Sequence, residues 1–303
     1  MRQLDITIWL TTFLVFAFIA GVFAIALTLV GAKEVLVAGI AFSLIFIGIQ
    51  WYIGPIIVKW ISGAKEVNRE QEPWLHETIE ELAAASGIPK PKVCLVNNPT
   101  PNAFAFGRTQ KDSYIAVHTG ILKLLNKEEL TAVLAHEIGH IKNRDVVIIT
   151  IASVLPVILY YAVLIGIGSK SDDDRPNPLA VWIGAIIAQF IGQLFVLWLS
   201  RQRELFADAH SANVTKNPLP LARALVKISY NLNPQRDINP TMSSFYISSG
   251  GAVSNKLVDA LNLDDREGLK EAIEKEEKGS LLGIFSTHPP TATRLKALLL
   301  KDN

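Results

Sequence analysis

Apolar residues are gathered into long blocks along this chain. Four stretches contain no Asp, Glu, Lys, Arg or His: Ile6–Ala32, Val35–Val58, Val146–Ser169 and Pro176–Ser200. A helix needs about 20 apolar residues to cross a hydrocarbon core of about 30 Å, and each stretch is longer than that. One such block could be a buried helix of a soluble protein, but four together predict four transmembrane helices.

The first block could instead be the core of a cleaved signal peptide. Arg2 precedes it, and small residues such as Ala20 and Gly21 lie within it. Its apolar run is about twice as long as a usual signal core. This length favours an uncleaved membrane anchor.

The basic residues near the ends of these blocks predict the orientation in the membrane, because Lys and Arg concentrate on the cytoplasmic side. On one side lie Arg2, Lys59, Lys65, Arg69, Lys142, Arg144, Arg201 and Arg203, and on the other Lys33, Lys170 and Arg175. The first side is therefore expected to be cytoplasmic. We predict a multi-pass protein of the plasma membrane whose termini and polar segments all face the cytoplasm.

Two polar segments remain outside the predicted spans, and neither is a convincing domain alone. We expect them to combine into one globular unit whose sequence is interrupted by a transmembrane hairpin. The expected organisation is transmembrane helices 1 and 2 in residues 1–60, the first part of the cytosolic domain in 61–145, the hairpin in 146–200 and the second part in 201–303.

Short-range patterns in the polar segments predict helices and a small sheet. Helical spacing in "EPWLHETIEELAAASGIP" ends at Gly87 and Pro89. The β-branched runs "KVCLVNN" and "SYIAVHTG" predict strands, with "NAFAFG" between them. Further helices are expected at Pro220–Tyr230, Asn255–Leu261, Arg266–Lys278 and Pro290–Leu300, with a mobile Ser- and Gly-rich loop over residues 239–255.

Charge and cysteine content narrow the functional classes. The net charge is +1, and the basic residues form no stripe of the kind that a phosphate backbone requires. We therefore expect no nucleic-acid partner. Cys94 is the single cysteine, which excludes an internal disulfide and agrees with a reducing compartment.

The stretch "LTAVLAHEIGHIKNRDVV" contains two histidines four residues apart. On a helix, His136 and His140 lie on one face and can direct their imidazoles at one ion. Glu137 is rotated by about 100° from His136, close enough to touch a water molecule on that ion. This is the HExxH spacing of zinc hydrolases. The alternative is a surface helix with two titrating histidines.

A catalytic zinc needs a third protein ligand. The predicted hairpin starts just after His140 and returns the chain just before Glu204, so Glu204 is the best candidate. Asp208 lies one helical turn further and could accept a hydrogen bond from a ligating histidine. Two alternatives are that Glu204 only pairs with a nearby arginine, and that His210 is the ligand, although its spacing places it on the opposite helix face.

The sequences "PNAFAFG", "HEIGH", "RELFAD" and "FSTHPPTATRL" occur in this order over most of the chain. Together they resemble the HtpX-type membrane-bound zinc metalloproteases, heat-shock enzymes in the metallopeptidase family shared with the CAAX prenyl proteases. The resemblance implies one Zn²⁺ per chain, bound by His136, His140 and Glu204, with Glu137 as the general base. It also implies quality control of misfolded or damaged membrane proteins and an active site that faces the cytoplasm.

The resulting fold class is α+β, with four transmembrane helices and a mainly helical zincin-like metalloprotease domain that contains a small β-sheet.

Further candidate residues complete the expected site. His288 in "STHPP" could donate a hydrogen bond to a developing oxyanion, a role that the resemblance supports, or it could be a structural loop residue. Asn102 and Ala103 are the substrate-binding candidates, because the segment suits an edge strand and resembles the Asn-Ala step of thermolysin-like enzymes. Arg294 could pair with Asp208, bind substrate or be a solvated surface charge.

Three other functions stay open from the sequence. A membrane scaffold or transporter would carry the histidines incidentally, but a transporter should have ionisable residues inside its spans, and these spans have none. An intramembrane protease should carry HExxH within an apolar block, whereas charged residues flank it here. A prenyl-protein protease belongs to the same resembled family. The sequence predicts protein substrates and a lipid bilayer as partners and leaves oligomeric state open.

Overall fold

A computed structural model describes residues 32–168, 177–231, 254, 257, 259, 266–277 and 288–300. The first predicted span, up to residue 31, lies outside the described residues, as do most of the predicted loop 239–255 and of the predicted helix that follows it. The chain forms two compact units. We call residues 1–50 with 153–193 the apolar unit, and residues 51–152 with 194–303 the polar unit.

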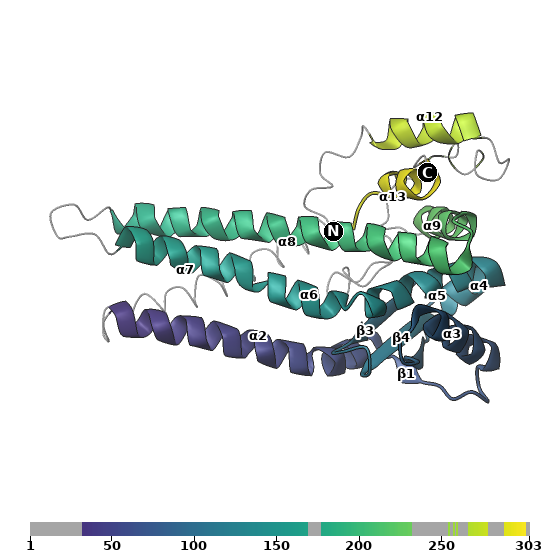
Figure 1. The fold of residues 1–303 in the computed structure, drawn as a ribbon, viewed down its shortest axis with the longest axis horizontal. Helices are drawn as coiled ribbons and strands as arrows, with labels where there is room; N and C mark the ends of the chain where they lie inside the picture. Colours follow the sequence, from purple (N-terminus) through teal and green to yellow (C-terminus); the bar gives the residue numbers. More distant parts are fainter. Residues whose placement is uncertain are drawn as a thin grey trace. The chain divides into compact units, whose positions relative to one another are not determined.

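Among the described residues, three helices are long and apolar enough to cross a membrane: Ala38–Ser62, Asp145–Leu164 and Leu179–Thr215. They correspond to the second, third and fourth predicted spans. The first belongs to α2 (Ala32–Ser62), and the last belongs to α8 (Pro178–Thr215) (Figure 1). Large apolar side chains on them are exposed, as expected for helices that lipid surrounds.

The third predicted span is interrupted, which the apolar pattern did not indicate. The structure divides it into α6 (Asp145–Ala152) and α7 (Val154–Gly168). Pro156 explains the break, because proline has no N–H to donate and its ring clashes with the carbonyl four residues earlier. Within the apolar unit, Gly192 of α8 lies so close to Pro156 that a Cβ there would be 2.8 Å from the proline Cα.

The polar unit contains a four-stranded sheet in the order β1-β2-β4-β3. The strands are β1 (Lys65–Glu66), β2 (Lys92–Val96), β3 (Ala103–Gly107) and β4 (Ser113–His118). β2 and β4 are parallel, and the other pairs are antiparallel. Three of these strands match the predicted runs, and β3 is the edge strand that its sequence indicated.

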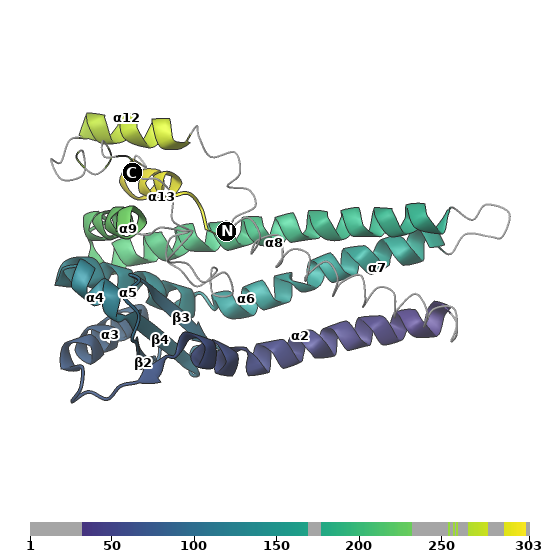
Figure 2. The same cartoon turned by 180° about the vertical axis from the view of Figure 1, so that it is seen from behind.

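In the polar unit, α5 carries the HExxH sequence and packs against α3, α9 and β3, while α13 packs on α9 and α12 packs on α13 (Figure 2). The helix bounds are α3 (Pro73–Ser86), α4 (Thr119–Leu124), α5 (Lys127–Lys142), α9 (Leu219–Asn231), α12 (Arg266–Glu277) and α13 (Thr291–Leu299). α5 begins with a capping box, in which Asn126 and Glu129 exchange hydrogen bonds. The buried Glu129 carboxylate also accepts from Lys227 of α9.

The close approach of α5 to α8 depends on Gly139, the fourth residue of "HEIGH". A Cβ at this position would lie 3.2 Å from the Ala207 Cα and from side-chain atoms of His210. The hydroxyl of Ser211 on α8 donates to the Ala132 carbonyl of α5 at 2.7 Å. A small residue at position 139 therefore allows the backbone of α8 to lie directly against the helix that carries the histidines.

Candidate metal centre

Three side chains from α5 and α8 converge in the polar unit. The Nε2 atoms of His136 and His140 are 3.1 Å apart. Glu204 places Oε1 3.5 Å from the His140 Nε2 and Oε2 3.7 Å from the His136 Nε2. These side chains form a group whose ligand atoms all lie within 4.8 Å of one another.

The chemistry and spacing of this group fit a tetrahedral zinc ion. Two imidazoles and one carboxylate are the ligands of many catalytic zinc sites, which leave the fourth position open. Bond lengths of 2.0–2.2 Å in a tetrahedron place ligand atoms about 3.3–3.6 Å apart. The two Nε2 atoms are 3.1 Å apart, and the nearest Glu204 oxygen to each, a different oxygen in the two cases, lies at 3.5 or 3.7 Å, close to this range.

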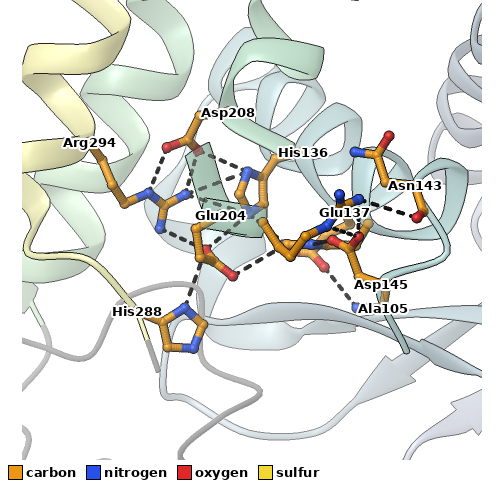
Figure 3. Close-up of polar contacts among 11 residues, drawn as sticks. Ala105, His136, Glu137, Asn143, Asp145, Glu204, Asp208, His288 and Arg294 are labelled. Atoms are coloured by element: carbon orange, nitrogen blue, oxygen red, sulfur yellow. Dashed lines mark hydrogen bonds and ion pairs between the residues drawn. The ribbon is translucent and has the colours of Figure 1, made fainter. Parts of the chain in front are cut away.

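The second ring nitrogen of His136, Nδ1, contacts a carboxylate. This Nδ1 lies 2.9 Å from Oδ1 of the buried Asp208, the residue for which the sequence suggests the role of hydrogen-bond acceptor. The Arg294 guanidinium donates to both oxygens of Asp208, at 2.8 and 2.6 Å. Figure 3 shows Asp208 in contact with both His136 and Arg294, which reaches in from α13. Burial alone would lower the pKa of Arg294, but the Asp208 carboxylate raises it.

His140 has its own carboxylate partner, which sequence reasoning missed. Its Nδ1 lies 2.6 Å from Oδ2 of Asp145, the first residue of α6. Arg203 of α8 binds the other Asp145 oxygen. Burial acts to lower the pKa of His140, but the carboxylates of Glu204 and Asp145 outweigh it and raise the pKa to about 9.

The Glu137 carboxylate is buried and lies against the edge of the sheet. Its Oε2 accepts a hydrogen bond from the Ala105 N–H of β3 at 2.7 Å (Figure 3). Burial raises the pKa of Glu137, while the nearby His136 and the Ala105 N–H act in the opposite direction. This hydrogen bond joins residues 32 positions apart, and no local sequence pattern signals it.

The main chain of β3 determines which of its residues face the open edge. Asn102 turns its carbonyl toward β4, where it accepts from the His118 N–H at 2.9 Å. Because the direction of main-chain groups alternates along a strand, Ala103 and Ala105 face away from β4. Ala103 thus directs its main-chain groups toward the edge, whereas Asn102, which is as buried as Ala103, could contribute only its side chain.

Of the other candidate residues, His288 and Arg294 lie beside Glu204, whereas His210 lies away from the three ligand side chains. The Nδ1 of His288 lies 3.2 Å from Oε2 of Glu204, and Nη1 of Arg294 lies 3.4 Å from the same oxygen. Both therefore adjoin the group of ligand atoms. His210, the alternative ligand, lies instead with its Nε2 2.9 Å from the Ser86 hydroxyl of α3.

Residues 69–301 match Peptidase family M48. The chain belongs to this family. It is 40% identical over 239 residues to "Protease HtpX homolog" of Methanothermobacter thermautotrophicus, covering 78% of this chain and 90% of the relative. It is 34% identical over 306 residues to the "Protease HtpX homolog" of Pyrococcus furiosus, covering 97% and 96%.

A solved structure, that of S. mikatae Ste24p, has a similar fold. The TM-score is 0.56 at 20% identity, with 98% of this chain and 66% of that chain covered. The likeness shows the fold alone. Family membership and the apolar helices together identify a membrane-associated metalloprotease that acts on proteins, which favours the protease hypothesis over a scaffold or transporter.

Proposed function

We propose that this M48 member is an integral-membrane zinc endopeptidase that hydrolyses misfolded or damaged membrane proteins and some cytosolic proteins. The convergence of His136, His140 and Glu204 beside Glu137 is the observation that carries the proposal. The quality-control role is supported by the resemblance of the four sequence motifs to HtpX-type proteases.

One zinc ion per chain would be held by His136, His140 and Glu204. A zinc ion bound there would acidify a water molecule and polarise the scissile carbonyl. Asp208 and Asp145 accept from the Nδ1 atoms of the two histidines, which leaves both Nε2 atoms as acceptors that face the metal position.

Glu137 is the proposed general base. Its carboxylate follows His136 on α5 but is directed toward the edge strand, beside the three ligand side chains and not among them. From this position it can accept a proton from the attacking water and pass it to the departing amine. The raised pKa of Glu137 suits a group that must both accept and return a proton.

His288 is the proposed donor to the oxyanion that develops on the scissile carbonyl. It is buried, and its ring adjoins Glu204. A donor already placed at the site stabilises charge that appears only in the transition state. Arg294 is occupied by Asp208, so we assign it a positioning role and not substrate binding.

β3 is the proposed substrate-binding strand, and its edge that faces away from β4 would receive the peptide. An extended peptide could pair with the outward main-chain groups of Ala103, with Asn102 contributing its side chain. The Ala105 N–H points to the same edge and is taken by Glu137. Substrate pairing and the position of the general base are therefore linked through one strand.

The proposed location is the plasma membrane, with the active site and both termini in the cytoplasm. The excess of basic residues on one side of the predicted spans supports this orientation. The proposal retains four transmembrane helices, with the protease domain formed by residues 61–145 and 201–303.

The test compares purified wild type with Glu137→Gln for zinc content and casein cleavage. Glu128→Gln is the matched control, because Glu128 is an exposed carboxylate on the same helix. We expect all three proteins to bind one zinc and only Glu137→Gln to lose cleavage. Undiminished hydrolysis by Glu137→Gln would refute the assignment.

A further inference from the structure

We propose that Asp145 and Arg203 form a clamp that orients His140 for metal binding. This inference rests on the zinc site proposed above and adds two positioning residues to it. The clamp is distinct from the Asp208–Arg294 pair, which holds the other histidine.

The first step is the contact between Asp145 and His140. A metal-binding imidazole is neutral, and only one of its two nitrogens then carries a proton. With Nδ1 at 2.6 Å from the Asp145 carboxylate, that proton lies on Nδ1. The Nε2 lone pair then faces the His136 Nε2 and the Glu204 carboxylate. Asp145 therefore sets both the tautomer and the ring orientation that a metal requires.

The second step is the contact between Arg203 and Asp145. The guanidinium binds Oδ1 through Nε and Nη2, and Oδ2 remains for His140. The same Nη2 donates to the Asn143 carbonyl at 3.2 Å. Arg203 thus fixes the carboxylate and the turn that precedes it, in which Arg144 adopts a left-handed conformation with φ of 56°.

The third step is the position of Arg203 immediately before Glu204 on α8. Consecutive helical residues differ in direction by about 100°, so one points at Asp145 while the next points at the histidines. The clamp therefore fixes the rotation of α8 at the turn that carries the third ligand. It joins the end of α5, the start of α6 and α8 at one point.

The two arginine–aspartate pairs differ in burial. The Arg294 side chain is 2% exposed, whereas the Arg203 side chain is 16% exposed. Removing Arg294 leaves a fully buried carboxylate without its main cation. Removing Arg203 leaves Asp145 nearer to solvent, so its effect should fall on metal binding more than on folding.

The experiment measures zinc dissociation constants of the full-length protein in detergent by competition with a fluorescent chelator. The variants are Asp145→Asn, Arg203→Met and their double variant, with Arg203→Lys as a second, milder change. Lys142→Met is the control, because it removes an exposed positive charge two residues after His140.

Each single variant should weaken zinc binding by about 10- to 100-fold, the usual effect of losing a partner of a metal-bound histidine. The double variant should be no weaker than the poorer single variant, because Arg203 acts through Asp145. Arg203→Lys should fall between Arg203→Met and wild type. The control should stay within about twofold. The cobalt-substituted Asp145→Asn protein should show a shifted visible absorption spectrum.

Unchanged zinc affinity in folded Asp145→Asn and Arg203→Lys would overturn the clamp, as would fully additive effects in the double variant. If wild type binds zinc and Glu137→Gln is inactive, such a result defeats the clamp alone. If wild type binds no zinc, the proposed function and the clamp both fail.

Discussion

Replacing Arg294 with methionine should strongly destabilise the polar unit. The guanidinium is buried and gives Asp208 two short hydrogen bonds, and it also lies 3.4 Å from Glu204. Methionine fills much of the volume but leaves the two buried carboxylates without this cation. Breaking a buried ion pair by removing one partner costs about 3–5 kcal/mol.

That cost predicts a large shift in thermal unfolding. For a unit of about 200 residues, each 1 kcal/mol lowers Tm by about 2–4 °C, so Arg294→Met should lower Tm by roughly 6–20 °C. The assay is tryptophan fluorescence during heating of the zinc-free protein in detergent, which separates stability from metal binding. Lys296→Met, an exposed position on the same helix, should change Tm little. Equal shifts in the two variants would refute the reasoning.

Three further predictions concern the site. Zinc should bind about tenfold more weakly for each pH unit below about 9, because the raised pKa of His140 means that zinc must displace its proton. Calorimetry in buffers of different ionisation enthalpy should detect the released proton. A zinc affinity that does not change with pH would contradict this prediction. Gly139→Ala should cost about 1–3 kcal/mol of stability and weaken zinc binding, because its Cβ would press on Ala207 and His210. Gly54→Ala, with open space around its Cβ, is the control, and matching Tm values would disprove the packing argument. Chelation should abolish casein cleavage and added zinc should restore it; cleavage that persists in chelator would argue against a metal-dependent reaction.

Much of the site could be anticipated from the sequence because its parts follow short periodicities. The four-residue interval of His136 and His140 places them on one helix face, and the interval from Glu204 to Asp208 does the same on α8. Glu204 is far from the histidines in the sequence, but the predicted transmembrane hairpin returns the chain to them and so indicated that Glu204 lies nearby. In the structure the helix Pro178–Thr215 runs without a break from the fourth predicted span through Glu204 and Asp208.

Other parts of the site follow no periodicity. Asp145 is five residues after His140 and lies beyond the end of α5, where the left-handed Arg144 redirects the chain. Helical geometry therefore gave no reason to pair them. The Glu137 contact with Ala105 depends on how α5 packs on the sheet. Arg294 could be a surface charge by sequence alone, and only the approach of α13 to Asp208 shows that it is buried.

The central claim is that His136, His140 and Glu204 hold one zinc ion. The most direct test is an experimental structure of the zinc-loaded protein, with anomalous diffraction recorded on both sides of the zinc absorption edge. The account predicts one zinc peak per chain, about 2.0–2.2 Å from both Nε2 atoms and from a Glu204 oxygen. A zinc peak bound elsewhere, or a zinc ion that lacks Glu204 as a ligand, would contradict it.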